Sequence, residues 1–74
     1  MTTARMHAYQ LLNWRVALWR NTYGNEPTPI ELVQSLNTMQ AMDIQPEQRL
    51  AMTRFRHLTQ DYRLRYARHV LGTN

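Results

Sequence analysis

The chain has 74 residues, enough for one domain over residues 1–74, and a domain of this size buries only about 60 % of the surface of its unfolded chain. It has no cysteine, which excludes disulfides and thiolate zinc sites. No apolar run is long enough for a membrane span, and we expect no membrane partner. The N-terminus lacks the basic and then apolar pattern of a signal peptide, so a cytoplasmic location is expected.

The positive charge is unevenly distributed. All nine basic residues are Arg, against five acidic residues, for a net charge of +4. Residues 1–23 carry three Arg and no acid, residues 24–44 carry three acids and no base, and residues 45–74 carry six Arg and two acids. A GC-rich coding sequence would explain the Arg bias, as would a need for bidentate contacts to carboxylate or phosphate. The exposed excess favours a negative partner, either nucleic acid or an acidic protein surface.

The first helix is expected at about residues 3–23. Thr2 or Thr3 can cap its start, and Gly24 follows it as a left-handed C-cap. Its apolar residues recur at helical spacing and predict a broad buried face: Tyr9, Leu12, Val16, Trp19 and Tyr23, widened by Ala4, Ala8, Leu11 and Leu18.

The second helix is expected at residues 29–42. Thr28, Pro29 and Glu31 form the N-cap, the N1 proline and the N3 acid of a capping box. Its predicted buried stripe is Leu32, Val33, Leu36 and Met39. Three methionines are expected to fill gaps in the core: Met39, Met42 and Met52.

The third helix is expected to run unbroken over residues 46–71. Pro46 fits its first position and Gly72 its end, with no Pro or Gly between them. Its predicted apolar stripe is Ala51, Phe55, Leu58, Tyr62, Tyr66 and His69. No segment alternates with period two, so the sequence predicts an all-α fold. The expected architecture is a small three-helix bundle with a long C-terminal helix.

No metal, cofactor or catalytic site is indicated. His57 and His69 differ by about 120° in helical phase, and no His or Cys stands at ligand spacing from another. Ser35 is the only serine, and its predicted face has no His that could act as a base. Helix-dipole stabilisation accounts for Glu31 and Glu47. We therefore expect a binding protein that is not an enzyme.

Two arginine stripes border the apolar face of the expected third helix. Arg49, Arg56 and Arg63 recur every seven residues and predict an outward edge for a partner. A second border is the alternative nucleic-acid edge, and it consists of Arg54, Arg65 and Arg68. The competing interpretation of both stripes is a solvated face that only keeps the protein soluble.

Trp14 is the residue of the first helix that breaks its pattern. On a helical wheel it lies about 140–180° from the Leu12 and Val16 stripe. An exposed Trp is typical of binding surfaces, so we predict a partner-binding surface made of Met6, His7, Gln10 and Trp14. The alternative is that Trp14 folds back over the edge of the bundle.

In size, Arg-rich composition and lack of a catalytic motif, the chain resembles small phage-encoded regulators that bind host machinery, such as the RNA-polymerase-binding regulator of a Xanthomonas phage. No motif matches residue by residue, so no residue role carries over. The resemblance implies contact with the polymerase β′ N-terminal region near the RNA exit channel, inhibition of initiation, and antitermination. We therefore expect a regulator that binds a larger protein complex.

Three alternatives remain open: a direct DNA- or RNA-binding protein, an inhibitor of another host enzyme or defence complex, and a self-associating helical module. The sequence leaves the oligomeric state open.

Overall fold

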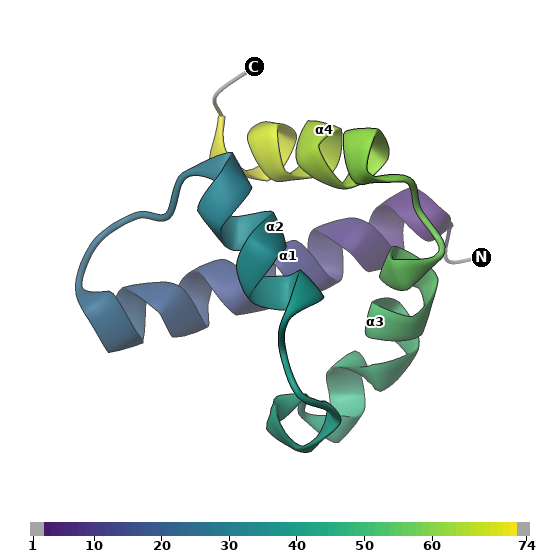
Figure 1. Ribbon diagram of the computed structural model, residues 1–74, viewed down its shortest axis with the longest axis horizontal. Helices are drawn as coiled ribbons and strands as arrows, with labels where there is room; N and C mark the ends of the chain where they lie inside the picture. Colours follow the sequence, from purple (N-terminus) through teal and green to yellow (C-terminus); the bar gives the residue numbers. More distant parts are fainter. Residues whose placement is uncertain (1–2, 73–74) are drawn as a thin grey trace.

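The computed structural model describes residues 3–72 (Figure 1). The helices are α1 (Ala4–Tyr23), α2 (Pro29–Asn37), α3 (Arg49–Arg56) and α4 (Gln60–Leu71), with 3-10 turns η1 (Ala41–Asp43) and η2 (Pro46–Gln48). Within this range there is no strand, which confirms the all-α prediction. None of the helices described over residues 3–72 combines the length and apolarity that crossing a bilayer requires.

Helix α1 is the element on which the others pack. Helices α3 and α4 both lie against it, while α2 packs mainly on α4 (Figure 1). The core between them consists of Ala8, Leu11, Leu12, Val16, Leu32, Val33, Leu36, Ile44, Ala51, Met52, Phe55 and Ala67. The predicted face of α1 is therefore confirmed in its middle, whereas Tyr23 at its end is exposed.

The ends of α1 follow the sequence prediction. The Thr3 hydroxyl accepts a hydrogen bond from the Met6 amide at 3.1 Å, so Thr3 is the N-cap. Thr2, the other candidate, lies outside the described residues. Gly24 has φ 74°, and its amide donates to the Arg20 carbonyl at 2.8 Å. Left-handed backbone of this kind favours glycine, because a Cβ would be strained there.

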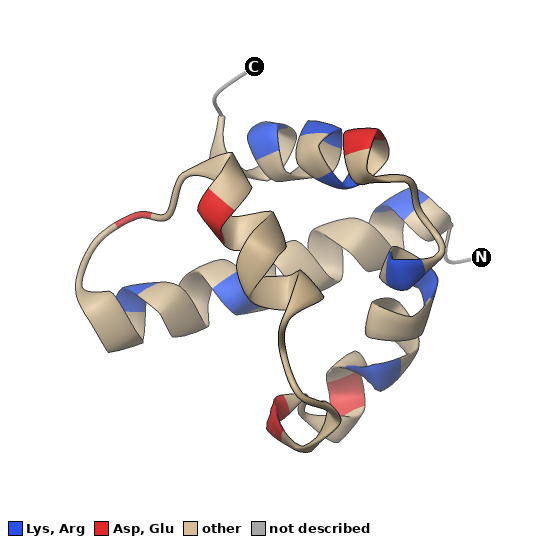
Figure 2. Cartoon of the chain, in the orientation of Figure 1, with Lys and Arg blue, Asp and Glu red and all other residues tan. Residues whose placement is uncertain are grey.

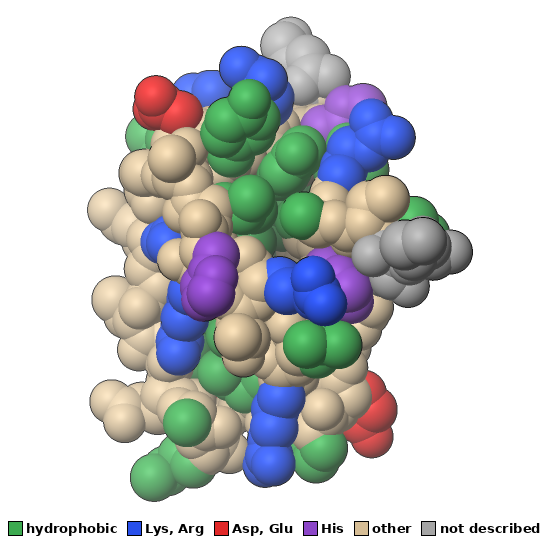
Figure 3. All heavy atoms as spheres, turned by 90° about the vertical axis from the view of Figure 1, so that its right-hand side faces the viewer, with side chains coloured by type: hydrophobic (Ala, Val, Ile, Leu, Met, Phe, Trp, Pro, Cys, Tyr) green, Lys and Arg blue, Asp and Glu red, His purple; other side chains and the backbone are tan. Residues whose placement is uncertain are grey.

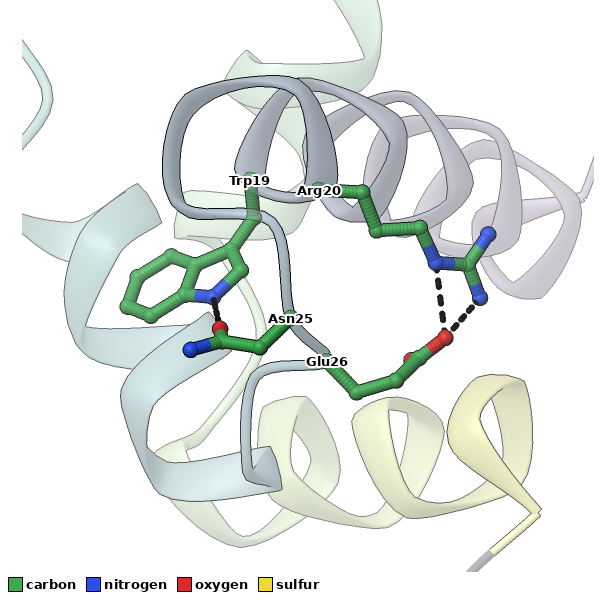
Figure 4. A network of polar contacts seen from close by, with 4 residues as sticks. All are labelled: Trp19, Arg20, Asn25 and Glu26. Carbon is green, nitrogen blue, oxygen red and sulfur yellow. Dashed lines mark hydrogen bonds and ion pairs between the residues drawn. The ribbon is translucent and has the colours of Figure 1, made fainter.

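Two side chains of α1 hold the loop that follows it (Figure 4). The Trp19 indole N–H donates to Asn25 Oδ1 at 3.0 Å. Arg20 forms an ion pair with Glu26, and its Nε donates to Glu26 Oε1 at 2.7 Å. One of the N-terminal Arg residues thus neutralises an acid of the middle segment.

The capping box of α2 is present, but the predicted end of this helix at residue 42 is wrong. Thr28 Oγ1 accepts from the Glu31 amide, and the Glu31 carboxylate accepts from the Thr28 amide. The helix ends at Asn37, and the chain becomes extended at Gln40 before η1. This exit lets Ile44 reach the core at 5 % exposure.

Met42 is the residue left outside by this exit. It is 86 % exposed, so its predicted role in the core is also wrong, whereas Met52 is buried as expected and Met39 is half-buried. Ile44 packs into the core where Met42 was expected, and the turn that carries Met42 remains on the surface.

The prediction of one long C-terminal helix is wrong, and the bundle therefore has four helices. Helix α3 ends in a tight turn in which the His57 amide donates to the Arg54 carbonyl at 3.1 Å. Thr59 is extended, with ψ 159°, and its hydroxyl accepts from the Tyr62 amide at 3.3 Å. An N-cap hydroxyl thus starts α4 without any Pro or Gly.

Arg63 stabilises this break. Its Nε donates to the Leu58 carbonyl at 3.0 Å and its Nη2 to the Arg56 carbonyl at 2.8 Å. Its Nη1 donates to Asn37 Oδ1 on α2 at 2.8 Å. The last carbonyls of a helix have no partner within that helix, so a guanidinium that binds the Arg56 carbonyl and the Leu58 carbonyl in the following turn compensates for ending α3 here.

The break also changes which face of the last segment is buried. In α4 the fully buried residue is Ala67, flanked by partly buried Leu64, Val70 and Leu71. Tyr62 is 45 % exposed and His69 is exposed, although the unbroken pattern places both in the core.

We predict that Thr59→Ala lowers the free energy of unfolding by about 1 kcal/mol, because α4 loses its N-cap. The matched control is Thr53→Ala, at an exposed position inside α3. It should leave stability unchanged or raise it by up to about 0.5 kcal/mol, since Ala has the higher helix propensity. Urea unfolding followed by circular dichroism measures both. A stabilising Thr59→Ala would indicate that residues 57–60 are helical.

Candidate functional site

The structure divides the first predicted arginine stripe between two roles. Arg49 and Arg56 lie on the surface of α3, whereas Arg63 belongs to α4 and binds backbone carbonyls at the helix break. The Arg63 guanidinium also lies 5.6 Å from the centre of the Phe55 ring. All three guanidinium nitrogens of Arg63 donate hydrogen bonds inside the fold, which favours a structural role, and its contact with a partner stays a prediction.

The residues of the predicted surface around Trp14 differ in exposure. Met6 is 52 % exposed, but His7 is only 7 % exposed, and its Nδ1 has no hydrogen-bond partner within residues 3–72. Gln10 Nε2 donates to the Glu47 carbonyl at 3.2 Å and to Gln48 Oε1 at 3.1 Å. Trp14 is half-buried and packs against the core, which matches the alternative interpretation. The burial of His7 and Trp14 thus leaves Met6 and Gln10 as the exposed members of this set, and partner binding there stays a prediction.

A hollow of about 530 Å³ lies between η1 and α3. Its lining combines apolar and basic residues: Ala41, Met42, Ile44, Arg49, Met52, Thr53 and Arg56. We call it the Met–Arg hollow. Ile44 and Met52 are almost fully buried, whereas Met42 is exposed. The hollow can therefore take an apolar side chain between two guanidinium groups.

The two arginines of the Met–Arg hollow differ in how they are held. Arg56 Nη2 donates to the Met39 carbonyl at 3.2 Å, which fixes the guanidinium near the exit of α2. The exposed Arg49 side chain makes no hydrogen bond or ion pair with any described residue. One anchored and one free cation suit binding to a carboxylate-bearing partner.

Positive charge dominates the side of the molecule around α3. Figure 2 shows blue segments along α3 and α4, and Figure 3 shows Arg and His side chains across this side with acidic ones towards its edges. Among residues 3–72 the one ion pair joins Arg20 and Glu26, at the far end of α1. The side chains of Arg54, Arg65 and Arg68, the alternative edge, are exposed and make no hydrogen bond within the described chain. Most of the basic excess thus remains available for a partner.

A polar network of Arg15 on α1 and Ser35 on α2 has a structural role. The Arg15 Nε donates to Ser35 Oγ at 3.0 Å, and Ser35 donates to the Leu32 carbonyl at 2.7 Å. Burial lowers the pKa of the Arg15 guanidinium from its usual value, a shift that Tyr23 partly opposes. The hydroxyl of Ser35 is thus fully used in holding α1 to α2.

Two exposed apolar residues, Leu50 and Met42, carry no signal in the sequence that marks them as surface residues. Leu50 is 57 % exposed at the start of α3, and Met42 is exposed because α2 ends early. A periodicity that treats residues 29–42 as one helix cannot place Met42 correctly.

Across residues 3–72, no three His, Asp or Glu side chains come close enough to hold a metal ion.

Comparison with known proteins gives no relative from which roles could be transferred: no protein-family model, no curated protein sequence and no solved structure matches this chain.

We predict that Arg63→Ala lowers the free energy of unfolding by about 2 kcal/mol, because the carbonyls of Arg56 and Leu58 lose their charged donor. Arg68→Ala removes the same charge from an exposed position of α4 and should change stability by less than about 0.5 kcal/mol. Chemical denaturation measures both. Equal effects would show that net charge, and not the break, sets the stability.

Proposed function

We propose that the protein is a non-enzymatic regulator that binds a larger protein complex through the Met–Arg hollow. The observation that carries this proposal is an apolar floor, Ile44 and Met52, beside an unpaired Arg49 and an anchored Arg56. The fitting partner is an acidic segment of a protein that offers one apolar side chain to the floor and carboxylates to the guanidinium groups.

Bacterial RNA polymerase is the first complex to test. The support for this choice is the resemblance in size, basic character and Arg-rich composition to phage-encoded regulators of polymerase. Such a regulator acts in the bacterial cytoplasm and alters transcription initiation and termination. The hollow supports the mode of contact, and the resemblance supports the identity of the complex.

Affinity purification from bacterial lysate tests the partner. The tagged protein, with nuclease present to remove bridging nucleic acid, should retain polymerase subunits. Recovery of no polymerase subunit contradicts polymerase as the partner. Recovery of another complex through the same hollow would replace polymerase by a different host enzyme or defence complex.

Variants at the hollow test the mode of contact. Arg49→Glu should weaken binding of the purified partner by at least about tenfold, since it reverses the free cation. Met42→Ala should weaken it by loss of apolar contact. The matched control is Arg54→Glu, an equal charge change at another exposed position of α3, and it should have less than about a twofold effect. Equal losses for Arg49→Glu and Arg54→Glu would rule out the hollow as the contact.

A further inference from the structure

Four aromatic side chains form a row where α4 lies along α1. The Tyr9 ring stacks on His69, with centres 5.2 Å apart and planes 14° apart, and meets the edge of Tyr66 at 5.6 Å. Tyr62 continues the row at 6.1 Å from Tyr66. We call these four residues the aromatic row. Because Tyr62 is 45 % exposed and His69 is exposed, both ends of the row are open to solvent.

Arginine connects the aromatic row to a second hollow. The Arg65 guanidinium lies over the Tyr62 ring, 4.8 Å from its centre. Arg65 also lines a hollow of about 450 Å³ together with Asp61, Leu64 and Arg68. On α1, the exposed Arg5 stands one helical turn before Tyr9 and thus on the same side of that helix. The exposed Tyr62 ring therefore lies directly beside a guanidinium group that also lines this hollow.

We propose that the aromatic row and the hollow beside it bind single-stranded RNA. Unpaired bases stack on the exposed faces of Tyr62 and His69, and the phosphates between them contact Arg65 and Arg68. Stacking on aromatic rings combined with a basic groove is how proteins hold single strands without a fixed sequence. Bases of a duplex are already stacked on one another, so a double strand has no faces to offer this row.

Asp61 is the reason to choose RNA over single-stranded DNA. A carboxylate among guanidinium groups repels phosphate, and so it weakens a site that needs only charge. It accepts a hydrogen bond, however, and the ribose 2′-hydroxyl is a donor that deoxyribose lacks. A hollow lined by Arg65, Arg68 and Asp61 therefore suits a ribose next to its phosphate.

This site is separate from the Met–Arg hollow. No lining residue of one contributes to the other, and the two lie on α3 with η1 and on α4, respectively. RNA binding therefore goes beyond the proposed protein contact, and the failure of either leaves the other standing.

Fluorescence anisotropy with a labelled 12-nucleotide single-stranded RNA tests the proposal on the full chain. The wild-type protein should bind this RNA at 50 mM salt, with affinity that falls as salt rises, and it should bind DNA of the same sequence several-fold more weakly. Tyr62→Ala and Arg65→Ala should each weaken RNA binding by at least about fivefold. Tyr62→Phe keeps the ring and should retain binding.

Arg49→Ala is the matched control for Arg65→Ala, since it removes an equal charge from an exposed position of α3, outside the aromatic row and its hollow. It should change affinity less than about twofold. Asp61→Ala should reduce the preference for RNA over DNA, because it removes the acceptor for the ribose 2′-hydroxyl, whereas the lost repulsion strengthens the binding of both strands. Circular dichroism confirms that each variant folds.

Three results would overturn the proposal. The first is no RNA binding at 50 mM salt. The second is binding that Tyr62→Ala and Arg65→Ala leave unchanged, or that Arg49→Ala weakens equally. The third is equal affinity of the wild-type protein for the RNA and the DNA strand.

Discussion

The Arg63 guanidinium closes the end of α3 by donating to the carbonyls of Arg56 and Leu58, and it reaches Asn37 on α2 with its remaining amino group. A chain of this length has little apolar area with which to compensate for unpaired backbone carbonyls at a helix break. One long side chain meets this need and joins α2, α3 and α4 at a single point. The orientation of α3 and α4 on α1 therefore depends on a charged residue and not on the core alone.

The break determines which surfaces the protein offers. An unbroken helix would align Arg49, Arg56 and Arg63 on one edge and bury Tyr62 and His69. In the folded chain, α3 keeps Arg49 and Arg56 beside Met42, while Tyr66 of α4 contacts Tyr9 of α1 and is followed by the exposed Tyr62. The exposed arginines thus fall into two groups. One group lines an apolar hollow that suits an acidic protein, and the other lies beside an aromatic row that suits unpaired bases.

The sequence predicts correctly those features that depend on residues close together in the chain. The capping box at Thr28 and Glu31, the left-handed Gly24 and the buried middle of α1 are confirmed because each depends on neighbours within four residues. The break at Thr59 was missed because an N-cap threonine looks like any helical threonine until its partners are known. Three other features depend on contacts between segments that are distant in the sequence, and periodicity cannot reveal such contacts. They are the hydrogen bonds of Arg63, the early end of α2 that exposes Met42, and the burial of His7.

The most direct test of the helix break, on which both proposed surfaces depend, is the backbone conformation of residues 57–60 in solution. Triple-resonance NMR gives it from Cα and carbonyl chemical shifts. We predict helical shifts for α3 and α4, interrupted at Leu58 and Thr59 by non-helical values, with a slowly exchanging Arg63 Nε proton held by the Leu58 carbonyl. Helical shifts without interruption from Arg49 to Leu71 would contradict the break and, with it, the surfaces that depend on it.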